Sequence, residues 1–226
     1  EAQFPGDRMP RRALRRAMEL ARPEIDLIHL VSVERMADWA RVAQLLQPVW
    51  MDGKVEGDST EETWLEKLTE QARIQGYAAQ SHRLSGAPGV VIAKFARDVQ
   101  ADLIIVASPR EGLSRELFLG STALKILRNS DCPVLVARND PSRAYQSAML
   151  AIDGNPLSER VIAAAGRFFP AARMDLVNAY LVPEEYKLRM RGVPEATIAD
   201  LRRAEGEKVE STLRPLAQLA PQATLH

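Results

Sequence analysis

Cysteine is nearly missing from this chain of 226 residues, in which Cys132 stands alone. A single cysteine excludes a disulfide bond within the chain, and scarcity of cysteine is compatible with a reducing compartment. We therefore expect a cytoplasmic protein. We interpret Cys132 as a small apolar residue at the entry to a strand rather than as a redox site.

An excess of either charge is also missing, and so are long apolar runs. The 30 basic residues balance the 30 acidic ones, so no basic excess indicates nucleic acid as a partner. The longest apolar runs are far too short to cross a bilayer, and no signal peptide is visible at the start of the sequence. We therefore expect neither a nucleic-acid partner nor a membrane partner.

Motifs of metal sites and of common catalytic sites are missing as well. His29, His82 and His226 have no Cys or acidic residue at a spacing that completes a ligand set, so we expect no metal. The sequence contains no nucleophile elbow, no P-loop and no His-Glu-x-x-His motif. We therefore expect no catalytic residues and no conventional enzymatic activity.

The most informative stretch that is present covers residues 101–138. Residues 103–106 are a short apolar run, typical of a parallel strand that is buried on both faces. Gly120 and Ser121 then begin an amphipathic helix, and residues 134–136 predict the next strand. A loop between the carboxyl end of a strand and a helix N-terminus is where doubly wound folds bind anions, because free backbone N–H groups point there.

Strands and helices are predicted to alternate along the rest of the chain too. Before this stretch we expect strands over residues 25–33 and 79–84, helices over 10–22, 36–49, 59–75 and 89–99, and a loop over 51–59. After it we expect strands over 148–153 and 174–180, helices over 155–169 and 196–219, and a charged loop over 183–194. The inner stripe of the last helix is predicted to be Ile198, Leu201, Val209, Leu213 and Leu216.

The motifs of residues 12–138 resemble those of a universal stress protein domain. Gly86-Ala87-Pro88 resembles the family's Gly-x-Pro entry to a helix. The family's glycine loop reads Gly, two residues, Gly, nine residues, and then Gly followed by Ser or Thr. Gly120 and Ser121 match the end of this loop, but the two earlier glycines are replaced by Ala107 and Arg110.

The pattern restarts after residue 147. An apolar strand that ends in Asp153, followed by a helix and another strand, resembles the start of a second universal stress protein domain. The resemblance implies an α/β fold of two tandem flavodoxin-like (Rossmann-like) parallel sheets, with helices on both faces and the strand order 3-2-1-4-5. The expected first domain is 1–138, the linker is 139–146 and the second domain is 147–226.

The resemblance also implies that both domains are incomplete. No apolar strand precedes Arg11, where the central first strand of the first sheet would lie. The chain stops at His226, near the point where the third strand of the second copy would begin. We therefore expect that residues are missing from the sequence.

In family members that bind ATP, the resemblance places the phosphates on the glycine loop and on the helix start that follows it. Ala107 adds a methyl group and Arg110 a long side chain where the backbone must approach the phosphates closely. Arg110 either clamps a phosphate or overhangs an unused site. Gly120, Ser121 and Thr122 either assist in binding an anion or only shape the loop and cap the helix.

Asp153 is the strongest single candidate for a ligand contact. In the family an acid just after the first strand contacts adenosine, and motif matching places Ala151, Ile152 and Ala179 in the lining of the adenine pocket. The alternative interpretation is that Asp153 belongs to a turn that caps the following helix.

The resemblance therefore implies a cytoplasmic stress-response protein with ATP as the candidate cofactor and with impaired binding in the first copy. Two alternatives stay open: an enzyme that hydrolyses or senses nucleotides through the second copy, and an interaction module with empty pockets. The resemblance also implies self-association along the last strand of the sheet, here residues 134–136.

Overall fold

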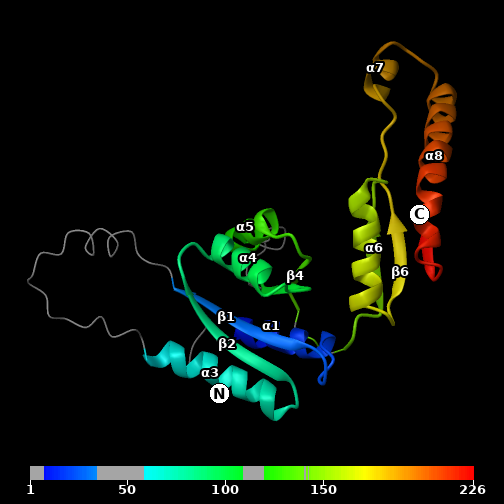
Figure 1. Cartoon of the computed structure of the whole chain (residues 1–226). Helices are drawn as coiled ribbons and strands as arrows, with labels where there is room; N and C mark the ends of the chain where they lie inside the picture. Colours follow the sequence, from blue (N-terminus) through cyan, green and yellow to red (C-terminus); the bar gives the residue numbers. More distant parts are fainter. Residues whose placement is uncertain (1–7, 35–58, 109–119, 140, 142) are drawn as a thin grey trace, which may run out of the picture. The chain divides into compact units, whose positions relative to one another are not determined.

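The computed structural model describes residues 8–34, 59–108, 120–139, 141 and 143–226 (Figure 1). It divides the chain into two compact units, Glu1–Ser142 (unit 1) and Arg143–His226 (unit 2). This boundary lies within the polar stretch predicted as a linker. That the units are two copies of one domain stays a prediction. Within the described ranges, no helix is long and apolar enough to cross a membrane.

Unit 1 alternates helices with parallel strands, as the sequence predicts. Its described elements are α1 (Arg8–Leu20), β1 (Leu27–Glu34), α3 (Ser59–Ile74), β2 (Ala78–Ser85), α4 (Pro88–Asp98), β3 (Ile104–Ala107), α5 (Ser121–Asn129) and β4 (Val134–Ala137). The end of α3 follows from the local sequence, because Gly76 adopts a φ of 87° that favours glycine. The helix predicted over 36–49, and nearly all of the loop predicted over 51–59, lie outside the described residues.

The strands of unit 1 form two parallel pairs. β1 pairs with β2, and β3 pairs with β4. The predicted α/β fold of parallel strands and helices is confirmed. β1 and β2 correspond to strands 2 and 3 of the predicted order 3-2-1-4-5, and β3 and β4 correspond to strands 4 and 5. Both pairs are neighbours in that order, but the complete order stays a prediction. Self-association along β4 stays a prediction too.

Helices cover both faces of the β1–β2 pair (Figure 1). Leu30 of β1 packs with Leu14 of α1 and with Leu65 and Leu68 of α3 in one buried cluster. The next residue towards the N-terminus, His29, points to the opposite face and contacts Phe95 of α4. This alternation follows from the pleat of the strand, which sends successive side chains to opposite faces.

Unit 2 contains β5 (Ser147–Ala151), α6 (Pro156–Phe168), β6 (Arg173–Val177), α7 (Glu185–Met190), α8 (Glu195–Gln218) and β7 (Ala223–Leu225). The strands form one parallel sheet in the order β5-β6-β7. Its core joins the sheet to α6 and α8, and its buried members include Leu150, Ile162, Met174, Leu176, Leu213 and Leu216. The prediction of Leu201 in the inner stripe of α8 is wrong, because its side chain is 41% exposed.

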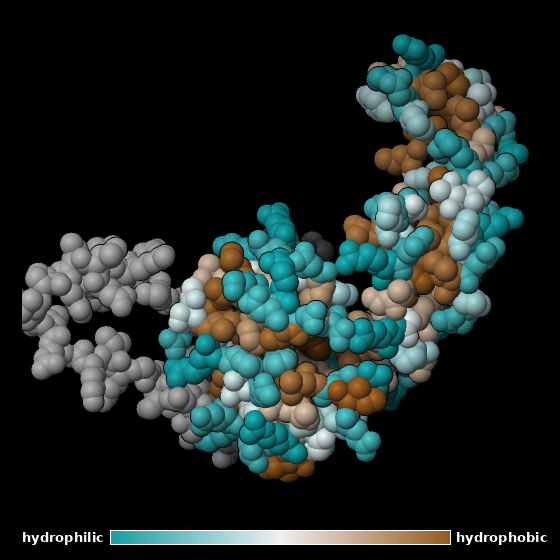
Figure 2. Space-filling view, viewed as in Figure 1, coloured by the Kyte–Doolittle hydropathy of each residue, from teal (hydrophilic) through white to brown (hydrophobic). Residues whose placement is uncertain are grey.

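The charged loop predicted over 183–194 contains a helix, α7. Glu185 of α7 forms ion pairs with Arg202 of α8 and with Arg189, and Glu195 also pairs with both arginines. The hydrogen bond from Arg202 lowers the pKa of the Glu185 carboxyl. Because Arg202 lies 17 residues beyond Glu185, this stabilisation comes from tertiary contacts that the local pattern does not contain. Figure 2 shows apolar surface around α7, where Leu181 and Met190 are exposed.

Candidate functional site

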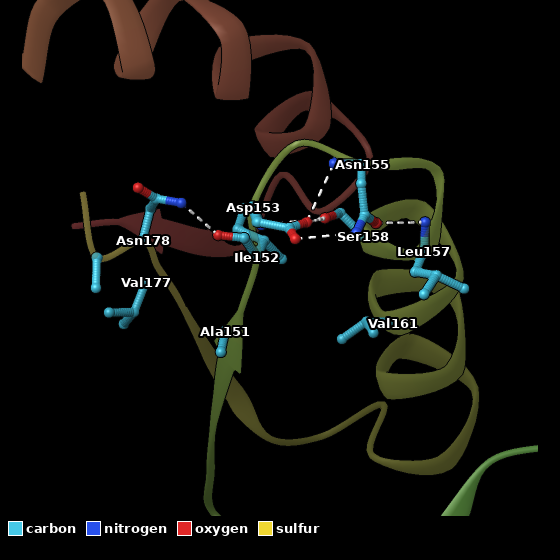
Figure 3. A pocket seen from close by; sticks show the side chains of 10 residues that line it. Ala151, Ile152, Asp153, Asn155, Leu157, Ser158, Val161, Val177 and Asn178 are labelled. Atoms are coloured by element: carbon cyan, nitrogen blue, oxygen red, sulfur yellow. Dashed lines mark hydrogen bonds between the residues drawn. The ribbon is translucent and has the colours of Figure 1, made fainter. Parts of the chain in front are cut away.

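A cavity of about 410 Å³ lies in unit 2, at the carboxyl ends of β5 and β6 (Figure 3). The two strands are parallel, so their carboxyl ends meet at one edge of the sheet. The backbone N–H of Ile152 donates to the carbonyl oxygen of Val177 at 3.0 Å and extends the pairing by one residue. Polar residues that follow both strands are thereby brought to the same place.

Four of the predicted site residues line this cavity: Ala151, Ile152, Asp153 and Ala179. Sequence reasoning missed the other lining residues, which are Asn155, Leu157, Ser158, Val161, Val177 and Asn178. One of them left a signal, because Asn178 directly follows an apolar strand just as Asp153 does. The lining residues on α6 could not be predicted, because helical periodicity does not say which residues of the first turns face a cavity.

The carboxylate of Asp153 organises the turn into α6. Its Oδ1 accepts hydrogen bonds from the backbone N–H of Asn155 and from Oγ of Ser158, both at 3.1 Å. Its Oδ2 accepts from Nδ2 of Asn155 at 2.9 Å. The turn also requires Gly154, whose φ of 80° is in the left-handed region. The geometry thus contains the turn that the alternative interpretation predicts.

This turn does not use the whole hydrogen-bonding capacity of the carboxylate. An ionised carboxylate offers about four acceptor positions, and the turn supplies three donors. The side chain of Asp153 is exposed at the mouth of the cavity. Asp153 therefore keeps capacity for a donor from outside the protein, and its role towards a ligand stays a prediction.

The start of α6 is fixed by a second side chain. Asn155 is the N-cap residue, and its Oδ1 accepts from the backbone N–H of Leu157 at 2.7 Å. Pro156 occupies the first helical position, where its fixed φ suits the helix and its missing N–H costs little. These local preferences explain why the sequence correctly predicts the beginning of this helix.

Asn178 joins the ends of the two strands across the cavity. Its Nδ2 donates to the carbonyl oxygen of Ile152 at 2.6 Å (Figure 3). This bond satisfies a carbonyl group beyond the end of β5 and holds the two chain segments together. The walls beside it are apolar and include Ala151, Val161 and Val177. An apolar wall with a few polar groups at fixed positions is typical of sites for small organic ligands.

The predicted anion-binding residues of unit 1 are only partly described. Ala107 is the last residue of β3 and pairs with Ala137 of β4. Gly120 is the N-cap of α5 with a φ of 78°, and Ser121 and Thr122 form the first turn of that helix. Arg110 lies outside the described residues, so its two interpretations stay open.

The residue that follows β3 also contacts α1. Ser108, which follows β3, uses its backbone carbonyl to accept a hydrogen bond of 2.8 Å from Nη1 of Arg12. Arg12 is only 4% exposed, although the sequence predicts merely a basic helix here. This helix therefore buries part of its charge against a carbonyl oxygen at the end of a strand.

No metal centre is found in the part of the chain that the structure describes: no three His, Cys, Asp or Glu side chains form a group that could hold an ion. The arrangement in unit 2 is instead that of a site for hydrogen bonding and apolar contact.

Comparison with known proteins shows which family the sequence matches. Residues 6–138, more than half of the chain, match the universal stress protein family. A universal stress protein of Methanocaldococcus jannaschii is 30% identical over 115 residues, which are 50% of this chain and 61% of that protein. One from Bacillus subtilis is 34% identical over 74 residues, 33% of this chain and 50% of that protein. The chain thus spans between half and two thirds of these relatives.

Comparison with solved structures shows which known folds the structure resembles. A crystal structure from Pseudomonas aeruginosa that is assigned to the universal stress proteins matches 92% of this chain and 75% of its own, at 18% identity and a TM-score of 0.54. At this identity the likeness concerns the fold alone, which agrees with the parallel strands and helices described above. The resemblance inferred from the motifs is confirmed by the family match, and the chain belongs to the universal stress protein family.

Proposed function

We propose that unit 2 binds an adenine nucleotide in the cavity beside Asp153. The observation that carries this proposal is the position of the carboxylate: it lies at the carboxyl ends of two parallel strands, beside an apolar wall, with acceptor capacity left over from its turn. Ribose hydroxyls and the adenine amino group are donors, so either suits this acceptor.

The remaining residues have distinct roles in this proposal. Ala151 and Val177 contact the flat faces of the ligand, because small and branched apolar side chains leave room for a ring. Asn155 and Ser158 orient the carboxylate of Asp153 through their hydrogen bonds. Asn178 holds the ends of β5 and β6 at a fixed separation.

For the chain as a whole we propose a tandem universal stress protein with a cytoplasmic role in stress response. The fold match over 92% of the chain supports two successive domains. We further propose that unit 1 binds ATP weakly or not at all, because Ala107 and Arg110 replace the glycines that would let the backbone approach phosphates. No bond-breaking step is part of this function.

The test is the substitution Asp153→Asn. Its amide oxygen still accepts from the backbone N–H of Asn155 and from Oγ of Ser158, so these two hydrogen bonds of the turn are kept. The amide nitrogen in place of Oδ2 no longer accepts from Nδ2 of Asn155, and the ligand loses a charged acceptor. Since hydrogen bonds to charged groups are stronger than neutral ones by about 1–1.5 kcal/mol, we expect the affinity for ATP and for adenosine to fall about tenfold. Isothermal titration calorimetry on the whole chain measures it.

Asp175→Asn is the matched control. Asp175 lies on β6 of the same unit and pairs with Arg173 and His226, but it does not line the cavity. We expect unchanged affinity for this variant. Equal affinities of wild type and Asp153→Asn, at equal thermal stability, would show that Asp153 is a turn residue only.

A further inference from the structure

Three rings from three elements meet on one face of the β1–β2 pair. His29 lies on β1 and His82 on β2, and their ring centroids are 5.0 Å apart. Nδ1 of His29 and Nε2 of His82 are separated by 2.9 Å, a hydrogen-bond distance. Phe95 of α4 contacts both imidazoles, with centroid distances of 5.7 Å to His29 and 4.6 Å to His82. The cluster thus connects α4 with the two strands.

This hydrogen bond depends on the protonation state of the pair. A neutral imidazole has one N–H and one lone pair, so one ring donates and the other accepts. The bond also survives when one of the two rings is protonated. When both are protonated, each of the facing nitrogens carries a proton and neither accepts. Two positive charges then stand where the hydrogen bond was, in a partly buried place.

Charged neighbours do not offset this repulsion. Glu34 of β1 and Arg83 of β2 pair with each other at 2.6 Å near the strand ends. The charged residues of α4 are paired as well, Lys94 with Asp98 at 2.9 Å and Arg97 with Asp131 at 2.7 Å. α1 and α3 pack on the opposite face, that of Leu30. Within the described ranges, no Asp, Glu or Cys completes a metal-binding group with the two imidazoles.

We propose that the His29–His82 pair is a pH-sensitive latch, which holds α4 on the β1–β2 pair at neutral pH and releases it on acidification. α4 also packs against α5, where Gly89 lies directly beside Lys125. Release of α4 is therefore expected to loosen α5, whose first turn follows Gly120.

The expected direction follows from linkage. Burial, and secondarily the charge of His82, lower the pKa of His29 from its ordinary value of 6.5. The unfolded chain then binds more protons than the folded one as the pH falls through this range. The stabilisation is complete above pH 6.5 and is lost as the pH falls towards the lowered pKa of His29.

Hydrogen exchange on the whole chain tests the latch. Between pH 7.5 and 5.5, histidines are the side chains that ordinarily titrate. After correction for the intrinsic exchange rate, we expect the protection of α4 amides to fall in wild type, by about tenfold for each unit by which the pKa of His29 is lowered. In His82→Gln an amide replaces the imidazole and takes no charge, so only the burial of His29 still opposes protonation and we expect a smaller fall than in wild type. In the double variant His29→Gln with His82→Gln neither side chain titrates, so we expect this fall to be absent.

His226→Gln is the matched control, since it removes the third histidine, which lies in unit 2; it should behave as wild type. A second measurement does not depend on any variant: the imidazole NMR signals of wild type should show coupled titration, with His29 titrating below pH 6.5. Unchanged protection of α4 in wild type, or independent titration of both rings at their ordinary pKa, would overturn the proposal.

Discussion

Replacing Leu176 with alanine is expected to lower the free energy of unfolding of unit 2 by about 2–5 kcal/mol. Leu176 lies on β6, the middle strand of the sheet, and its side chain is 0% exposed. It packs in one cluster with Leu150 of β5, Ile162 of α6 and Leu213 of α8. Truncation removes apolar contacts and leaves a cavity. Strands and helices both border this cavity, so the surrounding side chains can fill it only partly.

Urea denaturation followed by circular dichroism measures this effect, with hydrogen exchange of β6 as a local readout. Met149→Ala is the matched control: Met149 lies on the neighbouring strand β5 and is 73% exposed. We expect that variant to change the free energy by less than about 0.5 kcal/mol. Equal losses for the two variants would mean that the core of unit 2 is not where the structure places it.

Replacing Gly89 with alanine is expected to destabilise unit 1 by about 1–3 kcal/mol, the usual cost of overpacking. Gly89 is buried in α4, where a Cβ atom would stand 2.3 Å from Cβ of Lys125 and 3.2 Å from its backbone carbonyl carbon. The two helices would have to move apart. Alanine also favours a helix over glycine by up to about 1 kcal/mol, which offsets part of the loss.

Tryptophan fluorescence during urea denaturation follows this variant, because Trp39, Trp50 and Trp64 all belong to unit 1. Gly166→Ala in α6 is the matched control, since nothing lies within 4 Å of the added Cβ. It lies in unit 2, so circular dichroism measures its denaturation, and we expect a gain from helix propensity alone. In the double variant Gly89→Ala with Lys125→Gly, the stability should partly return. A denaturation midpoint of Gly89→Ala at or above that of wild type would contradict the close packing of α4 and α5.

The sequence predicted most elements because their signals are local. Apolar runs mark the strands β3 and β4. Gly76, Asn155 and Pro156 mark helix boundaries through backbone preferences that need no distant partner. Asp153 was singled out through the family resemblance, in which an acid directly after the first strand lies at the carboxyl edge of the sheet.

The features that the sequence did not predict depend on distant residues. Glu185 of α7 pairs with Arg202 of α8, a partner that the local sequence does not contain. The charged local sequence alone therefore resembled a loop. Leu201 satisfies the period of α8 but is exposed, whereas Ile198 three residues before it is fully buried. The contact of His29 with His82 required the parallel pairing of β1 with β2, which no spacing along the chain contains.

The sequence by itself determined the family and the alternation of strands and helices, and it predicted the turn at Asp153, because periodicity, caps and motifs are properties of short segments. The tertiary structure alone decided that Asn178 ties β6 to Ile152 and that Arg12 is buried against the end of β3. The reason is physical: a polar group takes its partners from whichever elements fold against it, and those neighbours are set by strand pairing and helix packing across the whole unit.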